Sequence, residues 1–399
     1  MASPAPAQAA DNAVTIGGHK VGVGEPTFIV AEAGVNHNGD VGTALRLVDL
    51  AADAGADAVK FQMFQAADLV TASAPVAQYQ QRGSPHRSQL EMLAQLELTQ
   101  KDFASIRDRC EARSILFLAT PFSERDVERL QELGVEAIKI ASTDLTNNAL
   151  LEAAARTRLP ILLSTGASTA VEIRNSVSRL CRPPTAGRPH EPTQPCSAYP
   201  SPKHRRGVNR PIACAPGSDQ HHTIAHGGLV LLHCISCYPT PVAKLNLRAI
   251  RALSESFSVP CGLSDHSLSV RAGGWALAAG ACLLEKHFTL DRTAPGPDHA
   301  ISLDAAQLTE YIATVREAES ALGSGKLGMS DAESEVREVA RRSIVSTTPI
   351  AAGTRITADM LTLKRPGTGI PPGDMCHLLD RQTARDIPAD TLLSWDMFE

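Results

Sequence analysis

The sequence lacks any apolar run long enough to span a membrane. Its longest apolar stretch, Gly273 to Leu284, is too short to cross a bilayer. The first residues, Met1 to Ala13, are rich in Ala and Pro and contain neither a basic region nor an apolar core, so they do not resemble a secretory signal peptide. We therefore expect a cytoplasmic protein with no membrane partner.

A strong excess of charge of one sign is also missing. The formal net charge is −5 over 399 residues, which gives no general electrostatic reason to expect a nucleic-acid partner. The nine cysteines are an odd number and are scattered along the chain, which favours free thiols in a reducing compartment. The one CxxC, Cys234 and Cys237, has no second pair with which to hold zinc, and we interpret it as packing.

Buried strands and helices are well represented, since eight short apolar runs alternate with helical patterns. Continuous apolar runs of this kind are typical of strands buried on both faces, and strand–helix alternation indicates parallel βαβ units. Eight units predict an α/β protein whose main domain is a (β/α)₈ TIM barrel over residues 25–322. The runs are Phe28–Ala33, Ala58–Gln62, Ile115–Thr120, Ala137–Ser142, Ile161–Thr165, Leu229–Ile235, Cys261–Asp265 and Cys282–Phe288.

The segments outside this pattern define the remaining organisation. Residues 1–24 are expected to form a disordered tail. Residues 182–227 are dense in Pro, Arg and His without periodicity, which predicts a disordered insertion in the barrel domain. Residues 323–338 begin with a Gly/Ser-rich segment and are expected to be a linker, and residues 339–399 form a small β-rich C-terminal domain.

Polar side chains recur at the C-terminal ends of the predicted strands. In a TIM barrel these ends converge on one mouth, where catalysis takes place. A lone polar residue in a strand is usually a satisfied core group, but the same placement in all eight runs favours a site. The set includes Glu32, Lys60, Gln62, Thr120, Lys139, Ser142, Ser164, His233, Ser236, Ser264, His266, Glu285 and His287.

Two lysines, Lys60 and Lys139, end different strands beside small hydroxyl residues. Two cations with several hydroxyl donors suit a phosphate and a carboxylate bound together. No P-loop or GxGxxG motif accompanies these lysines, so a nucleotide is not indicated. Two histidines, His266 and His287, end adjacent strands and could hold a divalent cation together with an acid, Glu32 or Asp298.

At these residues the sequence resembles the sialic acid synthase family, which comprises the N-acetylneuraminate synthases and their nonulosonate relatives. The resemblance runs from about Phe28 to the end, apart from the insertion. The end of the chain is similar to the antifreeze-like SAF domain of that family. The motifs are AEAGVNHNGD (31–40), AVKFQ (58–62), ATPF (119–122), IKIAS (138–142), STGAS (164–168), CYPTP (237–241), GLSDHS (262–267), EKHFT (285–289), GPDHAIS (296–302), ARRSI (340–344) and KRPGTGI (364–370).

The resemblance implies a role for each candidate residue. His266 and His287 hold a divalent metal, usually manganese, with magnesium or cobalt as alternatives. Arg365 reaches the sugar from the SAF domain of a partner subunit, which implies a domain-swapped homodimer. Phosphoenolpyruvate is bound by Lys60, Thr120, Lys139, Ser142, Ser164, Ser236 and Ser264, while Glu32, Gln62, Tyr238, Glu285 and Asp298 position the sugar or move protons.

Three functions are therefore open. The first is synthesis of N-acetylneuraminate from phosphoenolpyruvate and N-acetylmannosamine, and the second is synthesis of another nonulosonate, of legionaminate or pseudaminate type. The sugar-facing residues, Asp144 and Tyr238 among them, would separate these two hypotheses. At Asp144, sialic acid synthases commonly carry Glu. The third is a non-catalytic carbohydrate-binding protein, which would need neither the paired lysines nor the paired histidines.

Overall fold

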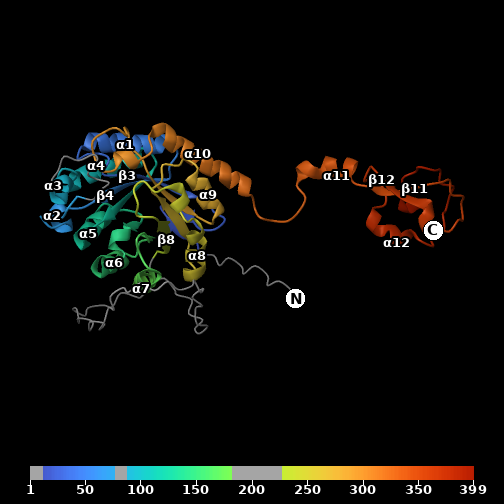
Figure 1. Ribbon diagram of the computed structural model, residues 1–399, viewed down its shortest axis with the longest axis horizontal. Coiled ribbons are helices and arrows are strands. Elements are labelled where there is room, and N and C mark those ends of the chain that lie inside the picture. The colour runs from blue at the N-terminus through green and yellow to red at the C-terminus, as the bar shows by residue number, and fades with distance from the viewer. Residues whose placement is uncertain (1–11, 77–87, 182–226) are drawn as a thin grey trace. The chain divides into compact units, whose positions relative to one another are not determined.

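The computed structural model describes residues 12–76, 88–181 and 227–399. The chain divides into two compact units, Met1–Gly323 and Ser324–Glu399 (Figure 1). The predicted insertion at residues 182–227 lies outside the described residues, except for Gly227. Among the residues that the structure describes, no helix is both long and apolar enough to cross a membrane.

The first unit is built on eight parallel strands, as predicted. Neighbours in the sheet follow the order β5-β4-β3-β10-β9-β8-β7-β6, and the two end strands, β5 and β6, contact each other and close the barrel. The strands are β3 (Phe28–Gly34), β4 (Ala58–Met63), β5 (Leu116–Pro121), β6 (Ile138–Ile140), β7 (Ile161–Ser164), β8 (Leu229–Cys234), β9 (Cys261–Asp265) and β10 (Leu283–His287). Each coincides with one predicted apolar run to within a few residues.

Helices connect successive strands and cover the outside of the barrel (Figure 1). Several begin at a side chain that accepts a hydrogen bond from the first turn, such as Asp40, Thr99 and Thr169, so the otherwise unpaired amides are satisfied. The long helices are α1 (Val41–Asp53), α4 (Gln100–Ala112), α5 (Glu124–Glu132), α6 (Asn148–Arg156), α7 (Ala170–Leu180), α8 (Arg248–Phe257), α9 (Ala272–Ala278) and α10 (Ala305–Leu322).

Shorter elements lie in the loops. They are α2 (Ala66–Leu69), α3 (Gln89–Ala94) and the 3₁₀ turns η2 (Ser142–Asp144), η3 (Val242–Lys244) and η4 (His299–Ile301). The three turns follow the C-terminal ends of barrel strands. They therefore contribute residues to the edge of the mouth, including Asp144.

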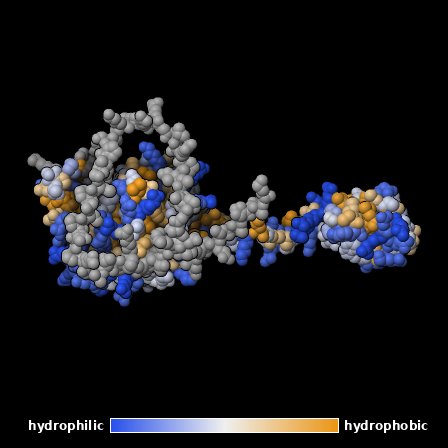
Figure 2. Space-filling view, turned by 90° about the horizontal axis from the view of Figure 1, so that it is seen from below, coloured by the Kyte–Doolittle hydropathy of each residue, from blue (hydrophilic) through white to orange (hydrophobic). Residues whose placement is uncertain are grey.

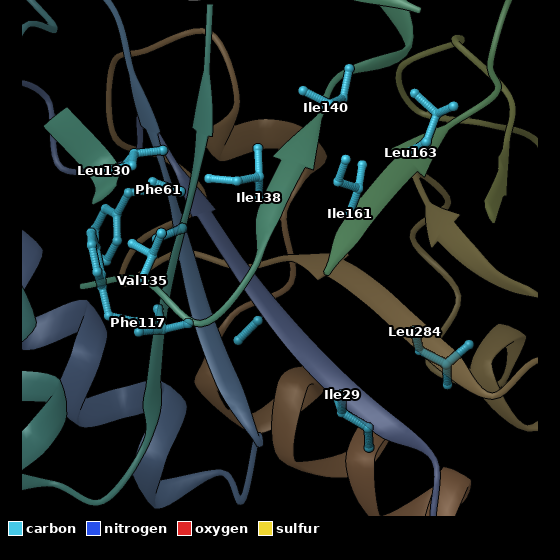
Figure 3. Packing of buried hydrophobic residues seen from close by; sticks show 14 of the residues in the cluster. Ile29, Phe61, Phe117, Leu130, Val135, Ile138, Ile140, Ile161, Leu163 and Leu284 are labelled. Atoms are coloured by element: carbon cyan, nitrogen blue, oxygen red, sulfur yellow. The ribbon is translucent and has the colours of Figure 1, made fainter. Parts of the chain in front are cut away.

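The barrel has two apolar layers because side chains alternate along each strand. Outward-facing residues such as Ile29, Leu163 and Leu284 pack against the surrounding helices (Figure 3). Inward-facing residues such as Phe28 and Leu283 form a second cluster inside the barrel. The inner apolar cluster is confined to the N-terminal part of the strands, so the polar residues are left at the opposite end.

The expectation that residues 1–24 form a disordered tail is wrong for part of that range. Strands β1 (Val14–Ile16) and β2 (His19–Val21) pair antiparallel across a turn at Gly17 and Gly18. The hairpin is held by burial, because Val14, Ile16 and Val21 belong to the inner apolar cluster. It therefore covers the N-terminal end of the barrel.

The second unit has a small antiparallel sheet, β11 (Ser343–Ser346) with β12 (Leu361–Lys364), and its own apolar core. Within the predicted linker 323–338, a 3₁₀ turn, η5 (Asp331–Glu333), begins at a capping box formed by Ser330 and Glu333. It leads directly into helix α11 (Ser334–Ala340). The remaining elements are α12 (Met375–Leu378), η6 (Ala358–Met360), η7 (Pro372–Asp374) and η8 (Trp395–Met397). Seen from below, the unit shows a hydrophobic area bordered by hydrophilic residues (Figure 2).

Candidate active site

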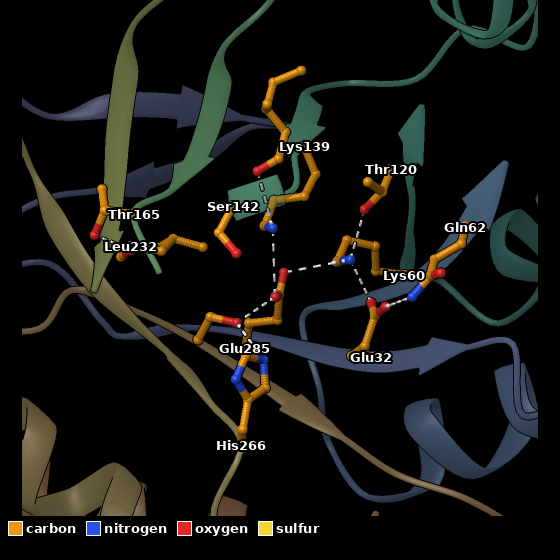
Figure 4. A network of polar contacts seen from close by, with 12 residues as sticks. Glu32, Lys60, Gln62, Thr120, Lys139, Ser142, Thr165, Leu232, His266 and Glu285 are labelled. Atoms are coloured by element: carbon orange, nitrogen blue, oxygen red, sulfur yellow. Dashed lines mark hydrogen bonds and ion pairs between the residues drawn. The ribbon is translucent and has the colours of Figure 1, made fainter. Parts of the chain in front are cut away.

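Two buried lysines and two buried carboxylates form the centre of the barrel mouth (Figure 4). Lys60 Nζ lies 2.6 Å from Glu32 Oε2 and donates a hydrogen bond to Thr120 Oγ1 at 2.8 Å. Glu285 lies between the lysines, with its two carboxylate oxygens 3.6 Å from Lys60 Nζ and from Lys139 Nζ. The four side chains come from strands β3, β4, β6 and β10, so the closed barrel brings together residues far apart in the sequence.

The electrostatics of this centre follow from burial and pairing. Burial alone would raise the pKa of Glu285, but the charges of Lys139 and Lys60 outweigh it and lower that pKa to about 2. Burial raises the pKa of Glu32 to about 7, although Lys60 opposes the shift. Glu285 is therefore a permanent anion, whereas Glu32 can hold or release a proton near neutral pH.

Hydroxyl groups surround the lysines on the side of β7 and β8. Ser142 and Ser236 lie with their oxygens 3.4 Å apart, and the buried Ser164 hydroxyl has no hydrogen-bond partner. Ser264 donates to Glu285 Oε1 at 2.7 Å. With Thr120 on β5, all seven residues predicted to bind phosphoenolpyruvate belong to this mouth. The buried, unpaired Ser164 hydroxyl is suited to donate to an acceptor on a bound anion.

The floor of this subsite is Gly166, in the loop after β7. A Cβ at this position would lie 2.5 Å from both Cys234 Sγ and Ser236 Oγ, and 3.2 Å from Ser142 Oγ. Only glycine permits these groups to approach so closely. Sequence reasoning missed Gly166 and interpreted Cys234 as packing. The available signals were its place directly after a predicted strand and within the STGAS motif (164–168).

The two histidines predicted to bind metal lie together, with ring centroids 5.5 Å apart. His266 Nδ1 lies 2.9 Å from the carbonyl oxygen of Ile235, so the hydrogen bond places the proton on Nδ1 and leaves Nε2 as a lone-pair donor. Burial lowers the pKa of both rings, which keeps them neutral, the form that binds metals.

This donor set fits a divalent cation with open coordination positions. The Nδ1 atom of His287 is buried without a partner, and the permanent anion Glu285 lies close enough to stabilise a nearby positive charge. Within residues 12–76, 88–181 and 227–399, no three His, Cys, Asp or Glu side chains form a metal cluster. A cation bound here would therefore take two protein nitrogens and leave its other positions to water or substrate.

The residues expected to serve the sugar border the histidines. The Tyr238 ring lies 4.3 Å from His266 and 6.5 Å from His287, between ring centroids. Gln62 Nε2 donates to Glu32 Oε1 at 3.3 Å. Asp298 Oδ2 lies near Gln62 and Glu32. All three polar groups are within 3.4 Å of the position that a Cβ on Gly34 would occupy. Burial raises the pKa of Asp298 to about 6.

Of the other polar residues considered, His233 does not join the mouth and Asp144 borders it. His233 points outward, and its Nε2 lies 2.8 Å from the carbonyl oxygen of Leu245, so it is a structural residue. Arg365 is exposed in the second unit, beside Pro366 and β12. Asp144, in η2, is half-buried and accepts hydrogen bonds from Thr143 and Asn147, both at 3.1 Å.

The chain is similar to known proteins over most of its length. Residues 47–327 match the model of the NeuB family, and residues 341–399 match the SAF domain. An N,N'-diacetyllegionaminic acid synthase of Legionella pneumophila is 36% identical, over 93% of this chain and 94% of that protein. Another N,N'-diacetyllegionaminic acid synthase, of Campylobacter jejuni, is 33% identical over 92% of this chain and 98% of that protein.

Among solved structures, an N-acetylneuraminic acid synthetase of Leptospira borgpetersenii, in complex with citrate, is 33% identical with a TM-score of 0.63. The match covers 81% of this chain and 94% of that one. The buried lysine and histidine pairs thus lie on a fold similar to that of the Leptospira enzyme. The chain belongs to the NeuB family of sialic-acid-type synthases and carries a C-terminal SAF domain.

Proposed function

We propose that this protein condenses phosphoenolpyruvate with the open-chain aldehyde of an N-acetylated amino sugar, giving a nonulosonate and phosphate. The supporting observation is that Lys60 and Lys139 converge through Glu285, with His266 beside it, on one barrel mouth (Figure 4). An anion subsite next to a metal subsite is what joining a phosphorylated enol to an aldehyde requires. A carbohydrate-binding protein would need neither.

The anionic substrate would be held by the two lysines and the nearby hydroxyls. Charge-assisted hydrogen bonds from Lys60 and Lys139 fit a phosphate and a carboxylate, and Ser164 has a free hydroxyl to donate. These contacts orient the nucleophilic C3 of phosphoenolpyruvate toward the histidines. A short approach between reacting carbons is the main contribution that such positioning makes to the rate.

The aldehyde would bind beside His266 and His287. A divalent cation, manganese in this proposal, would be held by the two imidazoles and would polarise the aldehyde oxygen as a Lewis acid. After C–C bond formation, C2 carries positive charge that water captures, and phosphate leaves by C–O cleavage. Glu32 is suited to accept the proton of that water, because its pKa of about 7 lets it act as a base near neutral pH.

Two sugars are the main candidates. N-Acetylmannosamine, which would give N-acetylneuraminate, is the substrate predicted from the sialic acid synthase motifs. A sugar with two acetamido groups is the second candidate, because two relatives that match over nearly the whole chain are named N,N'-diacetyllegionaminic acid synthases. Asp144 in place of the common Glu favours this second candidate, since the shorter carboxylate leaves more room for a substituent.

The test is phosphate release from phosphoenolpyruvate with Mn²⁺ and a panel of 2-acetamido and diacetamido sugars. We expect release that depends on both the sugar and the metal, with one sugar preferred by at least tenfold in kcat/KM. The nonulosonate should appear in equal amount. Absence of phosphate release with every sugar, from a folded protein that binds Mn²⁺, would contradict the proposed activity.

A further inference from the structure

Behind the two histidines, on the outer side of the same strands, lies a second buried ion pair. Lys286 Nζ lies 2.8 Å from Asp265 Oδ2, and both residues are only 1% exposed. Side chains alternate along strands, so Glu285 and His287 face the barrel interior while Lys286 faces the helices. Asp265 likewise faces outward, because the next residue, His266, faces the barrel interior. The pair therefore lies in the apolar layer between barrel and helices, where charged groups are rare.

The ion pair links the C-terminal ends of β9 and β10, directly beside His266 and His287. Lys286 and Asp265 are direct partners in the ladder between β10 and β9. The lysine also donates to the carbonyl oxygen of Ser267, and Asp265 Oδ1 accepts from the Ser267 amide at 2.8 Å. The residues on both sides of His266 are thus bound to one lysine, which itself precedes His287.

The surroundings fix this lysine in place. Its Nζ lies 5.4 Å from the centre of the Tyr311 ring, a cation–π contact from helix α10. Tyr311 is packed tightly against α9, where a Cβ on Gly273 would lie 2.7 Å from the tyrosine ring. A buried ion pair is a weak source of stability, because desolvation offsets the attraction between the charges. Its value is geometric, since it permits one arrangement of the two strand ends.

We infer that Asp265 and Lys286 are positioning residues that set the spacing of His266 and His287 and thereby the affinity of the site for a divalent cation. The inference rests on the proposed function, in which the two imidazoles hold the metal. Neither residue of the pair touches the substrate or the metal. They act through the backbone of β9 and β10.

The test is Mn²⁺ binding in the absence of substrates, measured by the electron paramagnetic resonance signal of free Mn²⁺. In Asp265→Asn/Lys286→Met, both charges are removed together, so no unpaired charge is left buried and the chain should fold. We expect the dissociation constant for Mn²⁺ to rise at least tenfold. Lys286→Arg keeps the charge balance and serves as a second variant. Its planar, longer head group cannot reproduce both contacts, and we expect at least a threefold rise.

A matched control separates positioning from general loosening of the strand. Leu284→Ala truncates an outward-facing residue on the same strand, two positions before Lys286, and leaves the ion pair intact. We expect it to lower the melting temperature without changing Mn²⁺ affinity by more than twofold. If the folded charge-pair variants bind Mn²⁺ within twofold of wild type, the positioning role is wrong. If wild type itself does not bind Mn²⁺, both this inference and the proposed metal site are wrong.

Discussion

Lys60 and Lys139 make different contacts, although both face Glu285. Lys60 also pairs with Glu32 and Thr120, whereas Lys139 contacts a backbone carbonyl, that of Ile140. Both nonetheless lie 3.6 Å from Glu285, the carboxylate to which the Ser264 hydroxyl donates a hydrogen bond. This placement assigns both lysines to phosphoenolpyruvate in the proposed reaction.

We therefore expect Lys60→Met and Lys139→Met each to raise the KM for phosphoenolpyruvate at least tenfold. A charge-assisted hydrogen bond contributes on the order of 1.5–3 kcal/mol, which corresponds to a change of this size. The KM for the sugar should change much less. Steady-state kinetics with each substrate varied in turn checks this, with the exposed Lys101→Met as control. A larger effect on the sugar than on phosphoenolpyruvate would reverse the assignment of the two subsites.

Glu32 gives a prediction for pH dependence. Burial raises its pKa to about 7, so the carboxylate is protonated in the free enzyme below that pH and ionised above it. If Glu32 accepts a proton during the reaction, only the ionised form is active. The value of kcat/KM should then rise with pH and level off above about pH 7.

The comparison variant is Glu32→Gln, which keeps the shape of the side chain without a titratable group. We expect its residual kcat/KM to be at least a hundredfold lower and to lack this rising limb. A pH profile identical in shape to that of wild type would show that another group, such as Asp298 with its pKa of about 6, carries the dependence.

The loop after β7 depends on one glycine. In Gly166→Ala the new Cβ must displace Cys234, Ser236 or both, because it would lie 2.5 Å from each side-chain atom. We expect the KM for phosphoenolpyruvate to rise at least tenfold, and the melting temperature to fall by a few degrees. Calorimetry together with steady-state kinetics measures both effects.

Gly274→Ala on α9 is the matched control for this substitution. There the new Cβ would meet its nearest neighbour, Ala318 Cβ, at 3.4 Å, an ordinary contact. Alanine is also the better helix former, by roughly 1 kcal/mol. We expect wild-type kinetics and equal or higher stability. Comparable loss of phosphoenolpyruvate binding in both variants would mean that the effect is not specific to the subsite.

The eight barrel strands could be predicted from the sequence because each is a short apolar run with a polar residue at or near its C-terminal end. The hairpin β1–β2 could not. Its strands have three residues each, too few to establish a periodicity, and they are held by burial against the barrel instead of by local propensity. Helix α11 was not predicted either, because it has only seven residues and directly follows a Gly/Ser-rich segment that indicates a linker.

Most of the candidate site was also predictable, because parallel strand ends must converge. The sequence did not reveal which polar side chains point into the barrel and which point toward the helices. His233 and Lys286 resemble their neighbours in sequence, yet both face outward. The pairing of Lys286 with Asp265 depends on the register between β9 and β10, which neither strand reveals alone.

The role of Arg365 can be tested only in the assembled protein. It is exposed in the second unit, and the family resemblance assigns it to the active site of a partner subunit. We expect Arg365→Ala and His266→Ala each to be nearly inactive. Co-expression of the two variants should recover a substantial fraction of wild-type activity, because a mixed dimer contains one intact site.

The measurement is activity of the purified mixed dimer, isolated with two different affinity tags. The two single-variant dimers, each purified alone, serve as controls and should stay inactive. If Arg365 serves its own barrel, every site in the mixture carries one lesion and no activity returns. A protein that is monomeric at assay concentration would also contradict the shared site.

The hairpin at the N-terminal end of the barrel has a kinetic consequence. Because the apolar side chains of Val14, Ile16 and Val21 pack into that end, we expect both substrates and both products of the proposed reaction to use the opening at the other end. Lys60 and Lys139 are buried, whereas Tyr238 is only half-buried, so we expect a ligand held by the lysines to lie behind one held near the tyrosine. A passage with a single opening is filled from the back, so for the proposed reaction we expect a compulsory order of binding, with phosphoenolpyruvate first and the sugar second.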